Sequence, residues 1–178
     1  MENGDRVVAQ AQQRFGGLDV VVANAAYELR GDILETALDD WDAHHAVLLR
    51  GAYATFKSAL PLMIPQRSGS LIAVASQLAF VGQNGSHRMF PPRLACLVLC
   101  DRSRWIARHG IRANALCPGP TLTPLLERQL TDLIEMKSCQ LGLAATLNGL
   151  GKPKEIANGG LFLASDESAF MTGGFPGN

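Results

Sequence analysis

Four cysteines are the first residues to consider for chemistry: Cys96, Cys100, Cys117 and Cys139. Cys96 and Cys100 stand four residues apart, a spacing that places two side chains on one face of a helix. A structural zinc site needs four ligands, and no histidine or cysteine pair nearby completes such a set. We therefore expect free thiols in a reducing cytoplasm and no metal site.

The composition of the chain argues against several classes of protein. Hydrophobic residues make up 47% of its 178 residues and charged residues 18%, which is typical of one globular domain. Lysine plus arginine and aspartate plus glutamate each total 16, so the zero net charge argues against nucleic acid or a membrane surface as the main partner. No apolar run reaches the roughly 18 residues of a membrane span, and the polar start "MENGDRVVAQ" is unlike a signal peptide.

Three segments carry the signals of helices. Residues 5–15 have an amphipathic pattern that the glycine pair at 16–17 should terminate. Residues 36–63 open with Thr36 as a candidate N-cap and continue with acidic residues in the first turn. Residues 153–165 begin with proline, which is favoured at the first position of a helix.

Three short apolar runs predict strands that are buried on both faces. They are "LDVVVA" at 18–23, "GSLIAVAS" at 69–76 and "GIRANALCPG" at 110–119. Because these runs alternate with helices, we expect crossover connections and a parallel sheet covered on both faces. Residues 120–150 mix helix and loop signals, and an insertion of this kind often covers a substrate site.

Four stretches, taken in order, resemble the short-chain dehydrogenase/reductase family. They are "GGLDVVVANAA" at 16–26, "GSLIAVASQLAFVG" at 69–82, "HGIRANALCPGPTLTP" at 109–124 and "GKPKEIANGGLFLASDESAFMTGG" at 151–174. The resemblance implies an α/β fold with an incomplete doubly wound, Rossmann-like parallel sheet and helices on both faces. It also implies an oxidoreductase that transfers hydride between NAD or NADP and a small alcohol or carbonyl substrate.

The catalytic residues of the family carry over only in part. Ser76 matches the serine that holds the carbonyl oxygen, although a serine at a strand end also serves simply to cap backbone groups. Met89, Arg93 and Leu48 occupy the positions expected for the tyrosine, the lysine and the relay asparagine. A thioether has no proton to donate, and arginine stays protonated in proteins. We therefore expect an impaired or inactive enzyme; the alternative is a non-catalytic pseudoenzyme that forms oligomers or binds a partner.

The resemblance also assigns cofactor contacts. Asn24 matches an asparagine whose amide ties neighbouring strands together, and Pro118, Gly119 and Thr123 match the loop that meets the nicotinamide end. A plain strand-to-loop turn would use Pro-Gly as well. The glycine-rich turn that holds the pyrophosphate does not occur in the sequence. We therefore expect residues 1–178 to form a single partial domain without the first βαβ units and the last strand, and to bind NAD or NADP weakly.

The segment "SHRMFPPRLACLVLCDRSRW" at 86–105 has a second interpretation at the level of nucleotides. Read one frame over, the codons of Arg88 and Met89 can give tyrosine, and those of Pro92 and Arg93 can give lysine four codons later. In the frame as given, two prolines interrupt a helix start and charged residues interrupt its apolar stripe. A compensated frameshift, in the gene or in its sequencing, accounts for these features, but it leaves Leu48 unexplained.

The resemblance finally implies a subunit interface. In this family the helices that match residues 36–63 and 93–108 commonly pack against a second subunit, so a homo-oligomer is expected. We expect neither nucleic acid nor a membrane as a partner.

Overall fold

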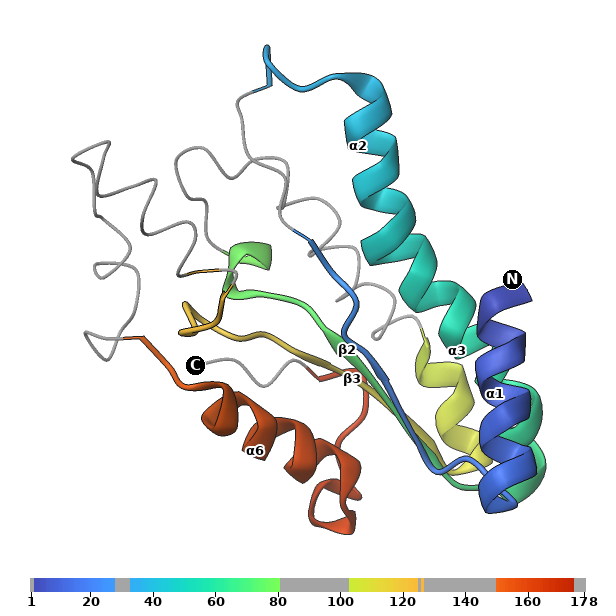
Figure 1. The fold of residues 1–178 in the computed structure, drawn as a ribbon. Coiled ribbons are helices and arrows are strands. Elements are labelled where there is room, and N and C mark those ends of the chain that lie inside the picture. The colour runs from blue at the N-terminus through green and yellow to red at the C-terminus, as the bar shows by residue number, and fades with distance from the viewer. Residues whose placement is uncertain (1, 28–32, 81–102, 125, 127–149, 175–178) are drawn as a thin grey trace.

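The computed structural model describes residues 2–27, 33–80, 103–124, 126 and 150–174, which are drawn in colour in Figure 1. Its centre is a parallel sheet with the order β1-β2-β3. The strands are β1 (Val20–Ala23), β2 (Gly69–Val74) and β3 (Ile111–Leu116). All three lie inside the apolar runs that predicted them, and the parallel sheet is confirmed.

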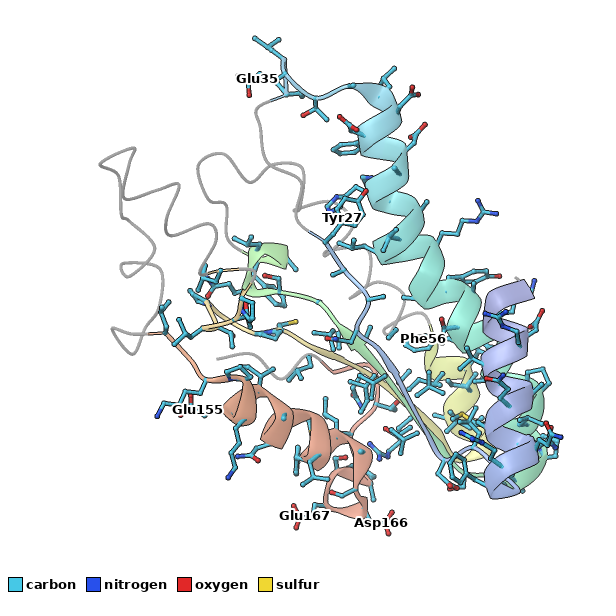
Figure 2. The ribbon with its side chains drawn as sticks, in the orientation of Figure 1. Tyr27, Glu35, Phe56, Glu155, Asp166 and Glu167 are labelled. Carbon is cyan, nitrogen blue, oxygen red and sulfur yellow. The ribbon has the colours of Figure 1, made fainter. Side chains whose placement is uncertain are left out.

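Helices cover both faces of this sheet, as expected for the fold class (Figure 1). The helix α6 (Pro153–Ala164) packs on one face, while α1 (Glu2–Phe15) and α3 (Gly51–Gln66) lie on the other. Phe56 of α3 is buried and points toward the sheet (Figure 2). The chain therefore has the layered α/β architecture of a Rossmann-like fold.

The long helical segment contains a π turn that the sequence did not predict. The helix α2 (Leu38–His45) leads into a π turn, Ala46–Arg50, which continues directly into α3. The N-cap of α2 is Ala37, whose side chain makes no capping hydrogen bond, so the prediction of Thr36 as N-cap is wrong. The first backbone bond of the helix runs from the Trp41 amide to the Ala37 carbonyl at 3.1 Å.

The other helix boundaries follow the signals in the sequence. Gly16 ends α1 with φ +81°, a left-handed conformation that glycine adopts readily, and its amide donates to Gln12. Pro153 is at the start of α6, as predicted. The short element η3 (Ser103–His109) is a 3₁₀ helix, whereas an α-helix was expected over 93–108. The first part of that segment lies outside the described residues.

The core lies between β2, β3 and the helices. Met63, Ile72, Ile106 and Ile111 are completely buried. Ser70 is polar but equally central, and its hydroxyl donates to the Leu163 carbonyl of α6 at 2.7 Å. This bond attaches α6 to the middle strand and satisfies a hydroxyl that would be costly to bury alone.

The free edge of β3 is partly occupied by the segment Met171–Gly174. The Gly173 amide donates to the Ala113 carbonyl at 2.8 Å, and the Ala115 amide donates to Gly174 at 3.0 Å. The buried side chain of Asn114 adds bonds to both ends of the segment, to Met171 and Gly174. The sequence did not predict that this segment pairs with β3, because hydrogen bonds between backbone groups leave no pattern in the side chains.

An arginine holds the turn that follows α6. Arg112 donates to the Ser168 hydroxyl at 2.8 Å and to the Ser165 carbonyl at 3.1 Å. Burial lowers the pKa of Arg112 below its ordinary value, and the charge of Asp166 opposes that shift. Asp166 and Glu167 themselves point away from the sheet (Figure 2).

A glycine substitution tests the packing at the start of β3. Gly110 has φ +74°, and a Cβ there would collide with the Arg67 carbonyl. Gly16 has a similar φ but nothing within 4 Å of that position. We expect Gly16→Ala to cost about 1–2 kcal/mol of unfolding free energy from backbone strain. Gly110→Ala should cost about 1–3 kcal/mol more from overpacking, as measured by urea denaturation. Equal losses in the two variants would contradict the described contact.

Candidate active site at the carboxyl edge of the sheet

The predicted polar residues follow the strands at one edge of the sheet. Parallel strands end on the same side, so the residues after β1, β2 and β3 lie at the carboxyl edge, where ligands bind in open α/β sheets. The ladder between β2 and β3 also continues past the strands. The Ala75 amide donates to Leu116 at 2.7 Å, and the Gln77 amide donates to the Pro118 carbonyl at 3.0 Å. These bonds bring the Ser76 region and the Pro118–Gly119 turn together.

Ser76 adopts a defined conformation at this edge. Its backbone is extended, with φ −168° and ψ 157°, and it caps the short 3₁₀ turn Gln77–Ala79. The hydroxyl oxygen accepts a hydrogen bond from the Leu78 amide at 3.2 Å. The role of a strand-end cap is thus observed. The bond uses only a lone pair of the oxygen, so the hydroxyl proton stays available to a ligand.

The turn after β3 is fixed from a second direction. The Gly151 amide donates to the Pro120 carbonyl at 2.9 Å, and the Leu122 amide donates to Gly151 at 2.8 Å. The Thr121 hydroxyl donates to the Gly119 carbonyl at 3.0 Å, while the Thr123 oxygen accepts from the Leu126 amide at 3.3 Å. These hydrogen bonds fix the loop, in which Pro118, Gly119 and Thr123 are half-buried.

Asn24 differs from the expectation for a strand-tying amide. It follows β1 directly and is exposed, and within the described part of the chain its side chain makes no hydrogen bond to a neighbouring strand. The buried Asn114 makes the inter-segment bonds instead, at the other side of the sheet. Sequence reasoning missed Asn114 because an asparagine within an apolar run carries no signal of its partner.

Leu48 lies at the centre of the π turn. Its side chain is 4% exposed, so an apolar residue fills a buried position where the family resemblance expects an asparagine. Single π turns in helices occur frequently at functional sites. The other substituted positions, Met89 and Arg93, lie outside the described residues.

No metal centre is found among the described residues: no group of three or more histidine, cysteine or acidic side chains is placed to hold a metal ion. Cys117, directly after β3, is buried, whereas Cys96, Cys100 and Cys139 lie outside the described residues. In the same described ranges, no helix has the length and apolarity needed to cross a membrane.

Comparison with known proteins decides the family. A family model described as Enoyl-(Acyl carrier protein) reductase matches residues 1–175. The chain belongs to the short-chain dehydrogenase/reductase family. Its parallel sheet and the arrangement of Ser76 beside Pro118 at the carboxyl edge agree with this membership.

Several curated members of the family are similar to the chain. The 3-oxoacyl-(acyl-carrier-protein) reductase FabG of Thermotoga maritima is 32% identical over 169 residues, which are 94% of this chain and 67% of that protein. Oxidoreductase UcpA of Salmonella typhimurium is 31% identical over 93% of this chain and 65% of its own length. The 2,5-dichloro-2,5-cyclohexadiene-1,4-diol dehydrogenase LinX of Sphingobium indicum is 27% identical over 95% of this chain and 66% of its own. The chain thus spans about two thirds of the length of these relatives.

The cap at Ser76 gives a prediction that does not depend on catalysis. Ser76→Ala should lower the free energy of unfolding by about 0.5–2 kcal/mol, because the Leu78 amide loses its acceptor. Ser76→Asp should retain most of the stability. Ser68→Ala, at an exposed serine before β2, is the matched control and should change little. Chemical denaturation measures the stability of the three variants. Equal stability of Ser76→Ala and Ser68→Ala would contradict the prediction.

Proposed function

We propose that this chain provides the substrate side of an NAD(P)-dependent oxidoreductase acting on a small alcohol or carbonyl compound. The observation that carries the proposal is the pairing of Gln77 with Pro118, which sets Ser76 beside the loop that resembles the nicotinamide contact of the family. The relatives named above include a 3-oxoacyl reductase and a cyclic diol dehydrogenase. A ketone or secondary alcohol is accordingly the substrate class to test first.

In this proposal, the residues at the carboxyl edge of the sheet bind and orient the substrate. The Ser76 hydroxyl donates its free proton to the oxygen of the reacting carbonyl and so fixes its direction. The loop at Pro118, Gly119 and Thr123 bounds the site on the side of β3, and Asn24 bounds it on the side of β1. The rigid hydrogen bonding of the loop reduces the ordering cost when a ligand binds.

A nicotinamide dinucleotide fits this edge in part. Gly119 is half-buried and Asn24 is exposed, and both carry groups that can hydrogen-bond to a carboxamide or ribose. The dinucleotide, when bound, supplies or accepts the hydride. No glycine-rich phosphate-binding turn occurs in the 178 residues, so binding to this chain should be weak.

The proposal also includes a loss of acid–base catalysis. Reduction of a carbonyl needs a proton donor next to the developing alkoxide, and the positions expected for it hold Met89 and Arg93. Leu48 fills the expected relay position with a buried aliphatic side chain. We propose that the chain reduces carbonyl substrates very slowly or not at all.

A reconstruction experiment tests this account of activity. Met89→Tyr with Arg93→Lys should raise carbonyl reduction about 10²–10⁴-fold, the usual contribution of general acid–base catalysis. The gain should require a glycine-rich βα unit from a relative, fused upstream to hold the cofactor. The assay is NADPH and NADH oxidation with a panel of ketones and 3-oxoacyl thioesters. Four proteins, with and without each repair, form the comparison.

Two outcomes would contradict the account. Steady turnover by the unaltered chain would show that it needs neither repair. Equal rates for the two fused proteins, with and without the Tyr–Lys pair, would show that Ser76 works with another donor. Adding Leu48→Asn to the double repair tests whether a relay side chain raises the rate further.

We propose a compensated frameshift as the origin of the altered segment. Resequencing the coding DNA should reveal two slips of opposite sign that bracket the codons of residues 88 to 105. An unaltered reading frame across this region would contradict the frameshift and leave a pseudoenzyme whose catalytic residues were replaced one by one.

A second candidate function is a non-catalytic, oligomer-forming module. The observation that favours it is apolar exposure on the predicted interface elements: Tyr53 of α3 and Trp105 of η3 are each 51% exposed. Aromatic side chains are enriched at interfaces. We propose a cytoplasmic location for such an assembly, since the thiols expected from the sequence suit a reducing compartment.

The oligomer can be tested by light scattering after size-exclusion chromatography. We expect the chain to form a dimer or larger assembly, and Tyr53→Asp with Trp105→Asp to shift it to a monomer, because charges are disfavoured in interface cores. Phe170→Asp is the control, at a fully exposed aromatic residue after α6. A monomeric unaltered chain, or dissociation by the control alone, would rule out the proposed interface.

A further inference from the structure

A buried histidine joins the helix α2 to the segment that leaves β1. His44 is completely buried, although most of its neighbours in α2 are exposed. Its Nε2 lies 3.1 Å from the carbonyl oxygen of Tyr27, a residue 17 positions earlier in the chain. A carbonyl only accepts, so the Nε2 carries the proton and donates.

The aromatic rings reinforce this connection. The ring of Tyr27 meets that of His44 edge-on, with centroids 5.1 Å apart and an interplanar angle of 76°. Edge-to-face packing at this distance is favourable. Figure 2 shows Tyr27 where the chain leaves β1, on the side of the helix. His44 thus contacts both the backbone and the ring of Tyr27.

Within the part of the chain that the structure describes, this connection acts on a segment that makes no hydrogen bond between Asn24 and Ala26. Asn24, Ala25 and Ala26 lie between the end of β1 and Tyr27, and all three are exposed. The sheet holds the segment at Ala23, through the register with Ala73. His44 holds its other end. The backbone that carries Asn24 therefore runs between one contact with the sheet and one contact with α2.

We propose that His44 is a positioning residue that fixes the segment 24–27 for ligand binding at the carboxyl edge of the sheet. The inference rests on the proposed function, because Asn24 is there assigned to the nicotinamide side of the site. His44 touches the backbone that carries Asn24, and it acts on the ligand only through that backbone.

The neighbouring His45 provides a matched control. It is on the same helix, but its Nδ1 lies 2.9 Å from the carbonyl of Trp41, one helical turn earlier. Its ring packs against that of Trp41 with centroids 4.3 Å apart and a tilt of 37°. These contacts, and an edge-on contact with the His44 ring at 6.4 Å between centroids, stay within α2 and do not reach the segment after β1. Loss of His45 should therefore disturb the helix surface without moving Asn24.

The first test is spectroscopic and needs no cofactor. Two-bond ¹H–¹⁵N spectra of the full chain should show a proton on Nε2 of His44 and a proton on Nδ1 of His45. Backbone amide shifts of residues 24–27 should change in His44→Leu, and stay near those of the unaltered chain in His44→Gln and His45→Leu. Glutamine retains a donor near the position of Nε2. A His44 ring protonated only on Nδ1, or unchanged shifts in His44→Leu, would overturn the inference.

The second test is binding of NADPH, followed by its fluorescence. His44→Leu should weaken binding about fivefold, the effect expected for one lost hydrogen bond. His44→Gln and His45→Leu should stay within about twofold, since each keeps a donor to Tyr27. Equal affinity of His44→Leu and the unaltered chain, or equal losses in the leucine and glutamine variants, would overturn the positioning role.

The failure of the proposed function would look different. If the unaltered chain binds neither NADPH nor NADH, the proposed function fails, and a role of His44 in cofactor binding fails with it. If the unaltered chain binds and only the pattern among the variants is wrong, the proposed function stands and the inference about His44 is rejected. The ring-proton and amide-shift measurements report on the His44–Tyr27 bond in both cases.

Discussion

The hydrogen bond from the Gln77 amide to the Pro118 carbonyl is the contact on which the site depends. It continues the parallel ladder of β2 and β3 after both strands have ended, so two loops start from one fixed position. Ser76 is thereby held in an extended conformation next to the Pro118–Gly119 turn. Because the bond joins main-chain atoms, it tolerates changes of side chain elsewhere. The scaffold of the site therefore persists although residues expected to do its chemistry are replaced.

The helices on the two faces of the sheet make different contributions to this edge. On one face, α6 is attached to the start of β2 through Ser70 and Leu163. Gly151, just before α6, bonds to the turn after β3 at the carboxyl edge. On the other face, α2 reaches the segment after β1 through His44 and Tyr27. The π turn between α2 and α3 separates this contact from the part of the helix that packs on the sheet. The segment that carries Asn24 thus runs between the sheet at Ala23 and the contact of His44 with Tyr27.

The sequence predicted those parts of the fold that follow from local patterns. Continuous apolar runs located the three strands, Gly16 located the end of α1, and Pro153 located the start of α6. Contacts between distant residues were not predictable, because nothing in the sequence near Asn114 or His44 specifies a partner in Met171 or Tyr27. Ser76 and Pro118 were predicted as site residues from family resemblance, while their connection through Gln77 became visible only in the structure.

The central claim is that the carboxyl edge of the sheet is the ligand site of this chain. The most direct measurement is a ¹H–¹⁵N NMR titration of the unaltered protein with NADPH at millimolar concentration, where weak binding is detectable. The account predicts amide shift changes concentrated at Asn24, Gln77, Gly119 and Thr123, with α1 and α6 unaffected. The absence of shifts, or shifts confined to α1 or α6, would contradict it.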